Sequence, residues 1–258
     1  MLTLKDKKVV VTRPIHRAQA LVDIIKDYGG DAVVVPTLEL KYVKSDELVY
    51  IAENIETFDW IIFTSPAGVK SFFDVYDKDT IPAKVAAIGI KTEEILNEYN
   101  ITCDMIPDVF TAEGLIEEFS KLDIKGMKIA LPRTLSARKV LPDTLKEFGA
   151  NVFIAEAYTS AIPDDTTDIK KLVCDIIDSK VDIITFTSPL TVSNLFSVAK
   201  EMDDGIYDKL ITSLSENITV ASIGPITGQV LKDVDVKYIE PDKYTTKDMI
   251  DAVVKNIN

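Results

Sequence analysis

The stretch that decides the fold runs from Asp59 to Pro66 and reads Asp-Trp-Ile-Ile-Phe-Thr-Ser-Pro. It returns from Asp182 to Pro189 as Asp-Ile-Ile-Thr-Phe-Thr-Ser-Pro, with the last four residues identical. In each copy the apolar run is typical of a buried strand. The serine and proline that follow are typical of a helix N-cap and of the first helical position. Each copy therefore predicts a strand that leads directly into a helix.

Three further segments of the first half recur in the same order in the second half. The pairs are Val9–Val35 with Lys128–Ile154, Val85–Gly89 with Val220–Gly224, and Pro107–Thr111 with Pro241–Thr245. Four pairs in one order, 120 to 135 residues apart, indicate an internal duplication whose period is too long for a solenoid. Because strand-like and helix-like periods alternate, we expect two similar α/β domains, each with a parallel sheet flanked by helices.

The first segment also predicts the bounds of its elements. Val9–Val11 is the first expected strand and Ala32–Val35 the second. Between them we expect a helix from about Gln19 to Tyr28, which ends at the glycine pair Gly29–Gly30.

Composition and charge limit the classes of function. The chain has 258 residues, of which 47% are hydrophobic and 28% charged, as in ordinary folded globular proteins. With 29 basic and 42 acidic side chains the net charge is −13, so we expect neither nucleic acid nor a membrane as a partner. The segment Met1–Pro14 has no apolar run long enough for a signal peptide or a spanning helix, so we expect a cytoplasmic protein.

Residues that hold metals or form catalytic triads are scarce. Cys103 and Cys174 lack metal-ligand spacing, so no disulfide framework or zinc site is indicated, and we expect both, with Trp60, in the core. His16 is the only histidine, which excludes most histidine-based triads and metal sites. We expect it in a solvated loop.

The turns that follow the expected strands have both a structural and a functional interpretation. Serine is an ordinary helix cap by residue type, and a glycine before a helix leaves the first N–H groups open. The turns beyond the carboxyl ends of parallel strands also form the crevice where open α/β sheets bind ligands. The candidates for ligand binding are Thr64, Ser65, Ser188, Gly89, Gly224 and Thr227. We expect Thr111 and Thr245 to be helix caps only.

Arginine is confined to one kind of turn. Arg13, Arg17, Arg133 and Arg138 are the only arginines, and all lie in the two strand-to-helix turns that are repeat mates. Because a guanidinium matches a carboxylate with two hydrogen bonds, we expect Arg13, Arg133 and Arg138 to bind carboxylates. A solvated surface role is the alternative for each of them.

Two extended segments, Thr37–Val43 and Ala155–Ile162, border on proline residues. If they cross together, one domain is built from both ends of the chain and the other from its middle. The residues alone leave open whether the domains follow the repeats instead. Tyr158 lies in the second segment, so its hydroxyl either faces a gap between domains or is satisfied locally.

Taken together, the motifs resemble the uroporphyrinogen-III synthase family over essentially the whole chain. They are Val-Thr-Arg-Pro near the start, both Phe-Thr-Ser-Pro blocks, Glu-Ala-Tyr-Thr, Ser-Ile-Gly-Pro-Ile-Thr and the late Tyr-Thr-Thr-Lys-Asp-Met. The resemblance implies two α/β domains joined by a two-stranded linker, with a cleft between the domains. The expected domains are residues 1–37 with 163–258, and residues 44–155, and the expected linker strands are 38–43 and 156–162.

The resemblance also implies a reaction. A lyase of this family cyclises and dehydrates hydroxymethylbilane to uroporphyrinogen III, inverting ring D through a spiro intermediate, without a metal or organic cofactor. Tyr158 matches the family tyrosine proposed to assist loss of the hydroxyl, and Ser188 and Thr227 match residues expected to orient substrate carboxylates. We expect a monomer that makes at most transient contact with hydroxymethylbilane synthase. The arginines and the helix N-termini are expected to offset the net negative charge toward this polyanion.

Two alternatives come from other classes. A non-catalytic two-domain binding protein has a similar architecture, but such receptors are usually exported. A carbohydrate- or nucleotide-processing enzyme is disfavoured because phosphate-loop motifs are missing. Only a synthase should bind linear tetrapyrroles and turn them over.

Overall fold

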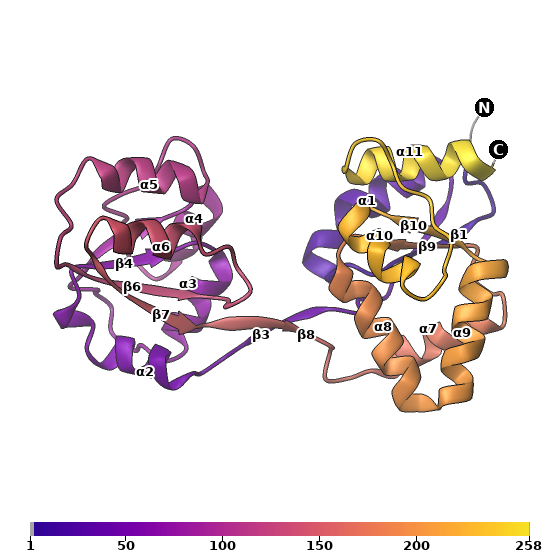
Figure 1. Cartoon of the computed structure of the whole chain (residues 1–258), viewed down its shortest axis with the longest axis horizontal. Helices are drawn as coiled ribbons and strands as arrows, with labels where there is room; N and C mark the ends of the chain where they lie inside the picture. Colours follow the sequence, from indigo (N-terminus) through magenta and orange to yellow (C-terminus); the bar gives the residue numbers. More distant parts are fainter. Residues whose placement is uncertain (1–2, 258) are drawn as a thin grey trace. The chain divides into compact units, whose positions relative to one another are not determined.

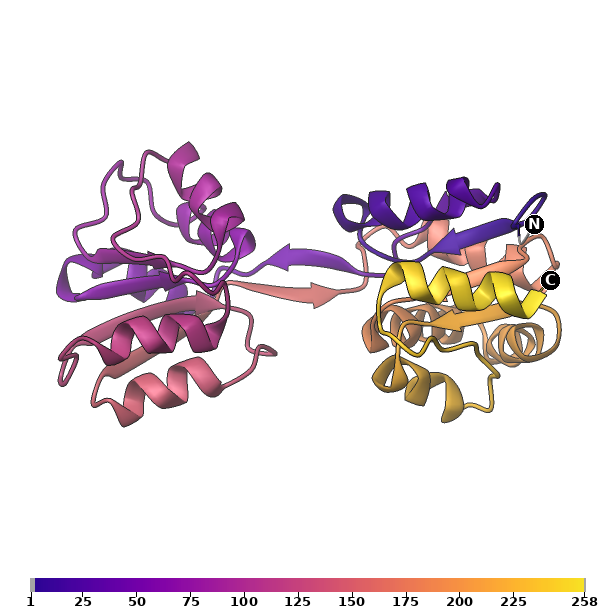
Figure 2. The ribbon, with the colours of Figure 1, turned by 90° about the horizontal axis from the view of Figure 1, so that it is seen from above.

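A computed structural model describes residues 3–257, which form two compact units. Unit 1 consists of Met1–Glu39 and Ala161–Asn258, and unit 2 of Leu40–Ser160. In each unit a sheet is covered by helices on both faces (Figures 1 and 2). Among the described residues, every helix is too short or too polar to pass through a lipid bilayer.

Unit 1 is built on a four-stranded parallel sheet with the order β10-β9-β1-β2. Its strands are β1 (Lys8–Val11), β2 (Asp31–Val34), β9 (Ile183–Phe186) and β10 (Thr219–Ser222). Its helices are α1 (Ile15–Asp27), α7 (Thr167–Ile177), α8 (Pro189–Met202), α9 (Asp204–Glu216), α10 (Pro225–Lys232) and α11 (Thr246–Ile257).

The valine run of β1 shows how this sheet is buried. Successive side chains of a strand point to opposite faces. Val10 accordingly packs with α7, α8, α9 and α10, whereas Val9 and Val11 pack with α1 and α11. Because helices cover both faces, the central strands are continuously apolar instead of alternating.

Unit 2 repeats this plan with the order β5-β4-β6-β7, again parallel throughout. Its strands are β4 (Trp60–Phe63), β5 (Lys84–Ala87), β6 (Lys128–Arg133) and β7 (Asn151–Glu156). Its helices are α2 (Asp46–Glu53), the 3₁₀ turn η1 (Ile55–Thr57), α3 (Pro66–Phe73), α4 (Ile90–Glu98), α5 (Ala112–Ser120) and α6 (Val140–Glu147). The helices α2, α3 and α4 pack on one face, and α5 and α6 on the other.

The strand order confirms the predicted duplication. β10, β9, β1 and β2 occupy the same places in their sheet as β5, β4, β6 and β7 occupy in theirs. The two Phe-Thr-Ser-Pro blocks thus follow equivalent strands, β9 in unit 1 and β4 in unit 2. The fold class of two similar parallel α/β sheets is confirmed.

The segments that connect the units form a small sheet of their own. β3 (Glu39–Tyr42) pairs with β8 (Tyr158–Ala161), and the chain leaves unit 1 through β3 and returns through β8. The two strands fall within the predicted linker strands. That residues 1–37 with 163–258, and residues 44–155, each fold as an independent domain stays a prediction.

Three expectations for local structure are corrected. Helix α1 begins at Ile15 instead of Gln19. The sequence pattern placed the start too late because Ile15 is exposed and the buried face of the helix starts only at Ala18. His16 therefore lies in a helix and not in a loop, and its side chain lies outside the described residues. Cys174 is exposed, because it falls on the outer face of α7, and Cys103 is only partly buried. Trp60 lies in the core as expected.

Candidate functional site

The carboxyl ends of the strands bring the candidate residues of unit 2 to one edge of the sheet. β4 ends just before Thr64 and Ser65, β5 ends before Gly89, and β6 ends at Arg133. β4 and β6 are neighbours, and the chain continues outward from β4 to β5 and from β6 to β7. Such a reversal of strand order opens a crevice at the carboxyl ends of the two central strands, where open sheets bind ligands. Ser65 and Arg133 follow the two strands that flank it.

Ser65 joins a helix cap to the predicted catalytic tyrosine. Its Oγ accepts the N–H of Gly68 at 3.2 Å as the N-cap of α3, and it donates to the hydroxyl oxygen of Tyr158 at 2.9 Å. The cap predicted for Ser65 is confirmed. Because the Tyr158 oxygen accepts this bond, its own proton is available for another acceptor.

Gly68 allows close packing between α3 and β6. A Cβ on Gly68 would lie 2.8 Å from the carbonyl oxygen of Pro132, which is on β6. Only glycine therefore lets the first turn of α3 lie directly against the β6 backbone. This close approach sets Ser65 beside the strand that ends at Arg133.

Arg133 is a buried cation without an acidic partner. Only 6% of its surface is exposed, its Nη2 donates to the carbonyl oxygen of Arg138 at 2.9 Å, and no carboxylate within residues 3–257 pairs with it. Burial lowers the pKa of Arg133, and the nearby Tyr158 offsets part of that shift. A buried charge is costly unless it is paired, so this guanidinium is suited to a ligand anion.

Arg138 is engaged elsewhere. Its Nη1 and Nη2 donate to the two carboxylate oxygens of Glu113 at 2.7 and 3.1 Å, and both side chains are exposed. The hydrogen bonds from Arg138 lower the pKa of Glu113, and the same pair raises the pKa of Arg138. In this structure, Arg138 therefore already holds a carboxylate of the protein itself.

Gly89 begins α4 in a left-handed conformation, with φ of 86°. The turn favours glycine for that reason. Thr92, in the first turn, is buried and donates to the carbonyl oxygen of Ile88 at 3.0 Å, so its hydroxyl is satisfied locally. Thr64 is half-buried, and its hydroxyl makes no hydrogen bond with the described residues.

The corresponding edge of unit 1 lies at the ends of β9 and β1, which are neighbours. Ser188 caps α8 as predicted, with its Oγ 3.4 Å from the N–H of Thr191. Arg13 follows β1, is half-buried and has no acidic partner in the described chain. Burial lowers the pKa of Arg13, and the charge of Arg17 lowers it further. Arg13 is thus a second unpaired guanidinium at a carboxyl edge.

Gly224 opens α10, and Pro225 takes the first helical position as predicted. Thr227 follows in the first turn with only 3% of its surface exposed. Unlike its repeat mate Thr92, it makes no side-chain hydrogen bond with the described residues. No fully buried polar side-chain atom among them lacks a partner, so the Thr227 hydroxyl reaches the surface.

Thr111 and Thr245 are caps, as predicted. Thr111 accepts the N–H of Gly114 at 3.1 Å before α5, and Thr245 accepts the N–H of Asp248 at 3.1 Å before α11. These contacts account for both residues.

The residues that sequence reasoning missed are apolar. Large exposed hydrophobic side chains lie in the turns and first helical turns at the carboxyl edges: Ile15, Leu190, Ile226 and Tyr244 in unit 1, and Ile90, Phe110 and Leu135 in unit 2. Ile226 is 77% exposed although it directly follows a buried strand and turn. The available signal was an apolar residue at the start of a helix, outside the buried face. Such side chains give the edges apolar contact surface beside the cations.

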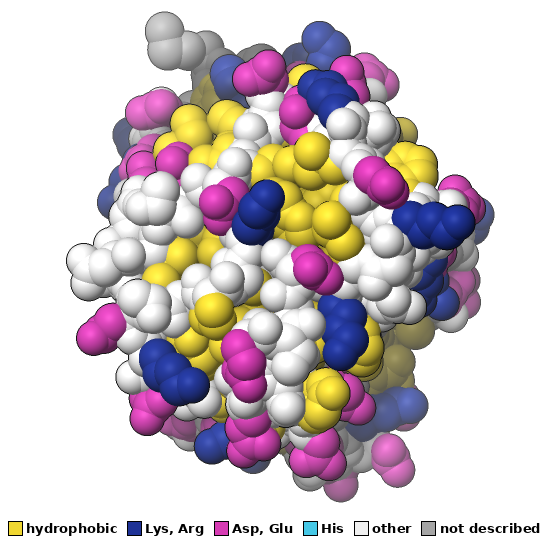
Figure 3. All heavy atoms as spheres, turned by 90° about the vertical axis from the view of Figure 1, so that its left-hand side faces the viewer, with side chains coloured by type: hydrophobic (Ala, Val, Ile, Leu, Met, Phe, Trp, Pro, Cys, Tyr) yellow, Lys and Arg dark blue, Asp and Glu magenta, His cyan; other side chains and the backbone are white. Residues whose placement is uncertain are grey.

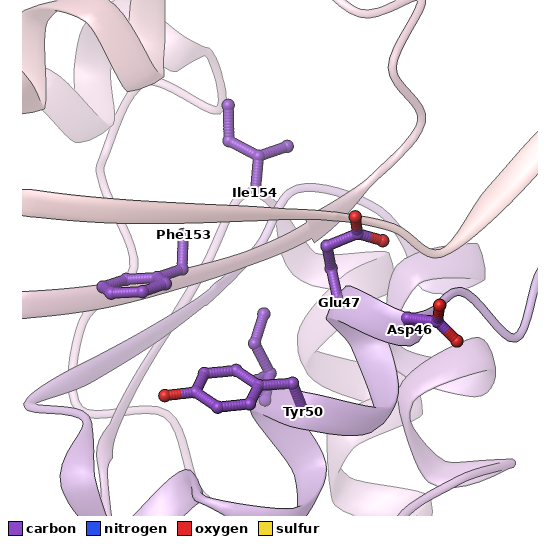
Figure 4. A pocket seen from close by; sticks show the side chains of 6 residues that line it. Asp46, Glu47, Tyr50, Phe153 and Ile154 are labelled. Atoms are coloured by element: carbon purple, nitrogen blue, oxygen red, sulfur yellow. The ribbon is translucent and has the colours of Figure 1, made fainter.

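One hollow of unit 2 is lined by acidic side chains, in contrast to the carboxyl edges with their arginines. It measures ≈ 470 Å³, and in Figure 4 the rings of Tyr50 and Phe153 border it from α2 and β7, with Asp46 and Glu47 at the start of α2. Its charged side chains are carboxylates, so it is unsuited to an anion. Within residues 3–257, no group of three or more His, Cys, Asp or Glu residues is arranged to hold a metal ion.

The comparisons with known proteins agree with the motifs. The sequence model of the family described as uroporphyrinogen-III synthase HemD matches residues 19–251, which is most of the chain. The chain belongs to this family. The uroporphyrinogen-III synthases are cyclising lyases of tetrapyrrole biosynthesis, so the predicted family and enzyme class are confirmed.

Individual members of the uroporphyrinogen-III synthase family match over most of their length. A protein of Methanothermobacter thermautotrophicus, provisionally named a uroporphyrinogen-III synthase, is 42% identical over 252 residues, 95% of this chain and 96% of its own. The uroporphyrinogen-III synthase of Chlorobaculum parvum is 27% identical over 90% of this chain and 91% of its own. The crystal structure of the Helicobacter pylori enzyme matches with a TM-score of 0.55 at 15% identity, covering 97% and 99% of the two chains, and shares the fold.

Proposed function

We propose that this enzyme closes hydroxymethylbilane to uroporphyrinogen III, with Tyr158 as the proton donor. Family membership supplies the reaction class, and the hydrogen bond from Ser65 to Tyr158 is the observation that supports this choice of residue. The bond fixes the phenol oxygen and leaves its proton for a substrate atom.

The proposed first step is the loss of the substrate hydroxyl. Tyr158 gives its proton to that oxygen, the C–O bond breaks with its electron pair on oxygen, and water leaves. The substrate becomes an azafulvene cation and Tyr158 a phenolate. The last pyrrole ring then attacks through its substituted carbon to give a spiro intermediate, which fragments and recloses with that ring inverted. Loss of a proton from the closed ring restores the phenol, so the net change is one water.

The substrate carries acetate and propionate groups on every ring, and we propose that the carboxyl edges bind them. Arg13 and Arg133 have no acidic partner within the described residues, so each can pair with a substrate carboxylate. The first N–H groups of α4 at Gly89 and of α10 at Gly224 suit further carboxylates. The hydroxyls of Thr64, Ser188 and Thr227 are proposed to complete these contacts.

The exposed apolar side chains suit the pyrrole rings. Ile226 and Tyr244 in unit 1, and Phe110 in unit 2, offer apolar surface beside the anion-binding turns. Holding the flexible chain in one conformation favours spiro attack over simple closure in water. The predicted cleft between the domains stays a prediction.

Arg138 is proposed to bind a substrate carboxylate only after it releases Glu113. Its two hydrogen bonds to Glu113 have to be exchanged for a substrate carboxylate. Both partners are exposed, and exposed ion pairs contribute little, so this exchange is inexpensive.

The reaction involves no net oxidation or reduction, and the steps proposed above draw on protein groups alone. The monomeric state, the cytoplasmic location and a transient contact with hydroxymethylbilane synthase stay predictions.

A coupled assay tests the proposed function. Hydroxymethylbilane is generated in situ, the protein is added, the products are oxidised, and uroporphyrins I and III are separated by chromatography. We expect isomer III to predominate. Isomer I alone, as in the control without protein, would reject the proposal and favour a non-catalytic binding protein.

A further inference from the structure

A second hollow of unit 2 adjoins the carboxyl end of β6. It measures ≈ 410 Å³ and is bordered by Arg133, Lys139 and Lys146, with Leu135 and Ile154 among its apolar side chains. Asp143 is the single carboxylate among the residues that border it. The lining therefore has an excess of two positive charges in a chain whose net charge is −13. We call this hollow the α6 pocket.

One face of α6 supplies most of this charge. Lys139 is the N-cap of the helix, and Asp143 and Lys146 follow four and seven residues later, which places all three on the same face. Leu141 and Leu145 occupy the opposite face and pack in the core. Neither lysine forms an ion pair within the described residues, so both charges are available.

The repeat mate of α6 has no such face. In α1 the residues at the corresponding positions are Gln19, Asp23 and Lys26, and Gln19 Nε2 donates to Asp23 Oδ1 at 2.7 Å. On the face of unit 2 that Figure 3 shows, the left-hand side of Figure 1, basic and acidic side chains are interspersed. The excess of cations on this face of α6 is thus not shared by its repeat mate α1.

We propose that the α6 pocket binds one side-chain carboxylate of the tetrapyrrole substrate. The exposed Lys139 and Lys146 attract and pair with the carboxylate, and the buried Arg133 borders the same hollow. The short carbon stem lies against Leu135 and Ile154. Lys139 and Lys146 are then specificity-determining residues that no motif of the sequence indicates. This inference rests on the proposed function and names a binding site for its substrate.

Charge-neutralising variants test this pocket. Lys139→Gln and Lys146→Gln should each raise KM for hydroxymethylbilane about threefold, and the double variant about tenfold, as for partly exposed ion pairs. kcat should stay within about twofold, because the pairs form with substrate and transition state alike. Lys26→Gln is the matched control, since it removes the same charge from the last turn of α1 and should leave KM unchanged.

Two measurements separate failure of this inference from failure of the proposed function. Wild-type protein is first assayed for isomer III, and its absence would remove the proposed function. Binding of uroporphyrin III, an intact tetrapyrrole carboxylate, is then followed by fluorescence anisotropy for every variant. If the double variant binds uroporphyrin III more weakly than Lys26→Gln does and still forms isomer III, the result supports carboxylate binding in the α6 pocket. Equal binding and equal KM in both would overturn it.

Discussion

Ser65 offers the sharpest test of how the site is built, because the chain contains a structural twin. Ser45 caps α2, accepting the N–H of Leu48 at 3.2 Å and donating to the carbonyl oxygen of Glu156 at 2.9 Å. Ser65 caps α3 with a 3.2 Å bond from Gly68 and donates to Tyr158 at 2.9 Å. Both helices have eight residues and both lie in unit 2. The two serines thus make the same cap, and they differ in the acceptor of the hydroxyl proton.

The expected losses follow from these contacts. Replacing either serine by alanine removes a cap that contributes about 1 kcal/mol. It also removes a second hydrogen bond that contributes about 1 kcal/mol. Ser65→Ala and Ser45→Ala should therefore lower the free energy of unfolding by a similar amount, about 2 kcal/mol in total. Loss of the bond that orients Tyr158 should in addition lower kcat about tenfold in Ser65→Ala alone, because about 1.4 kcal/mol of barrier is a factor of ten.

The assay is steady-state formation of isomer III, with stability followed by urea denaturation. Ser65→Thr should restore both the cap and kcat, since threonine keeps the hydroxyl. In a Tyr158→Phe background, Ser65→Ala should have little further effect on kcat, because the two residues act as one unit. Ser65 does not orient Tyr158 if Ser65→Ala and Ser45→Ala lose the same activity, or if the effect of Ser65→Ala persists unchanged without the Tyr158 hydroxyl.

Four further predictions follow from individual residues and from the core of unit 2. Glu113→Gln should free Arg138 and lower KM about two- to threefold, whereas Arg138→Gln should raise it; an unchanged KM in both variants would exclude Arg138 from substrate binding. Burial raises the pKa of Cys103 from 9.0 to about 11, so at pH 8 iodoacetamide should modify the exposed Cys174 well before Cys103, as mass spectrometry can show. The folded-state pKa of Cys103 lies above the unfolded value, so its contribution to the free energy of unfolding is present below pH 9 and should be lost as the pH rises toward about 11. In Cys103→Ala the free energy of unfolding should decline less over this pH range. An equally steep decline in that variant would contradict the raised pKa of Cys103. A fragment of residues 44–155 should unfold cooperatively in urea, because two core clusters cover both faces of its sheet, and a gradual transition would contradict the predicted domain limits.

Much of the fold was predictable because it depends on short-range patterns. Apolar runs that end in Thr-Ser-Pro specify a buried strand and a capped helix locally, and Ser65 and Ser188 cap their helices as expected. The repeated order of such segments then predicts two sheets of the same topology. The start of α1 was misplaced because the exposed Ile15 does not follow the amphipathic pattern.

The site was predictable by residue type more than by contact. Arginine, serine and glycine fall at the carboxyl edges because strands end there, which local patterns indicate. The partner of each side chain depends on packing between segments that are distant in sequence. Tyr158 meets Ser65 across 93 residues, and Arg138 meets Glu113 across 25. Periodicity carries no information about such pairs, so neither contact was foreseen.

Proton donation by Tyr158 is tested most directly by a comparison of two leaving groups. Tyr158→Phe is assayed with hydroxymethylbilane and with the same bilane carrying an acetate ester in place of the hydroxyl. An ester leaves as carboxylate and needs no proton, whereas a hydroxyl does. With hydroxymethylbilane, kcat should fall by at least about a hundredfold, the usual contribution of a general acid. With the ester, the rate should stay within about threefold of wild type, since only orientation is lost. An equal loss with both substrates would contradict the assignment of Tyr158 as the acid.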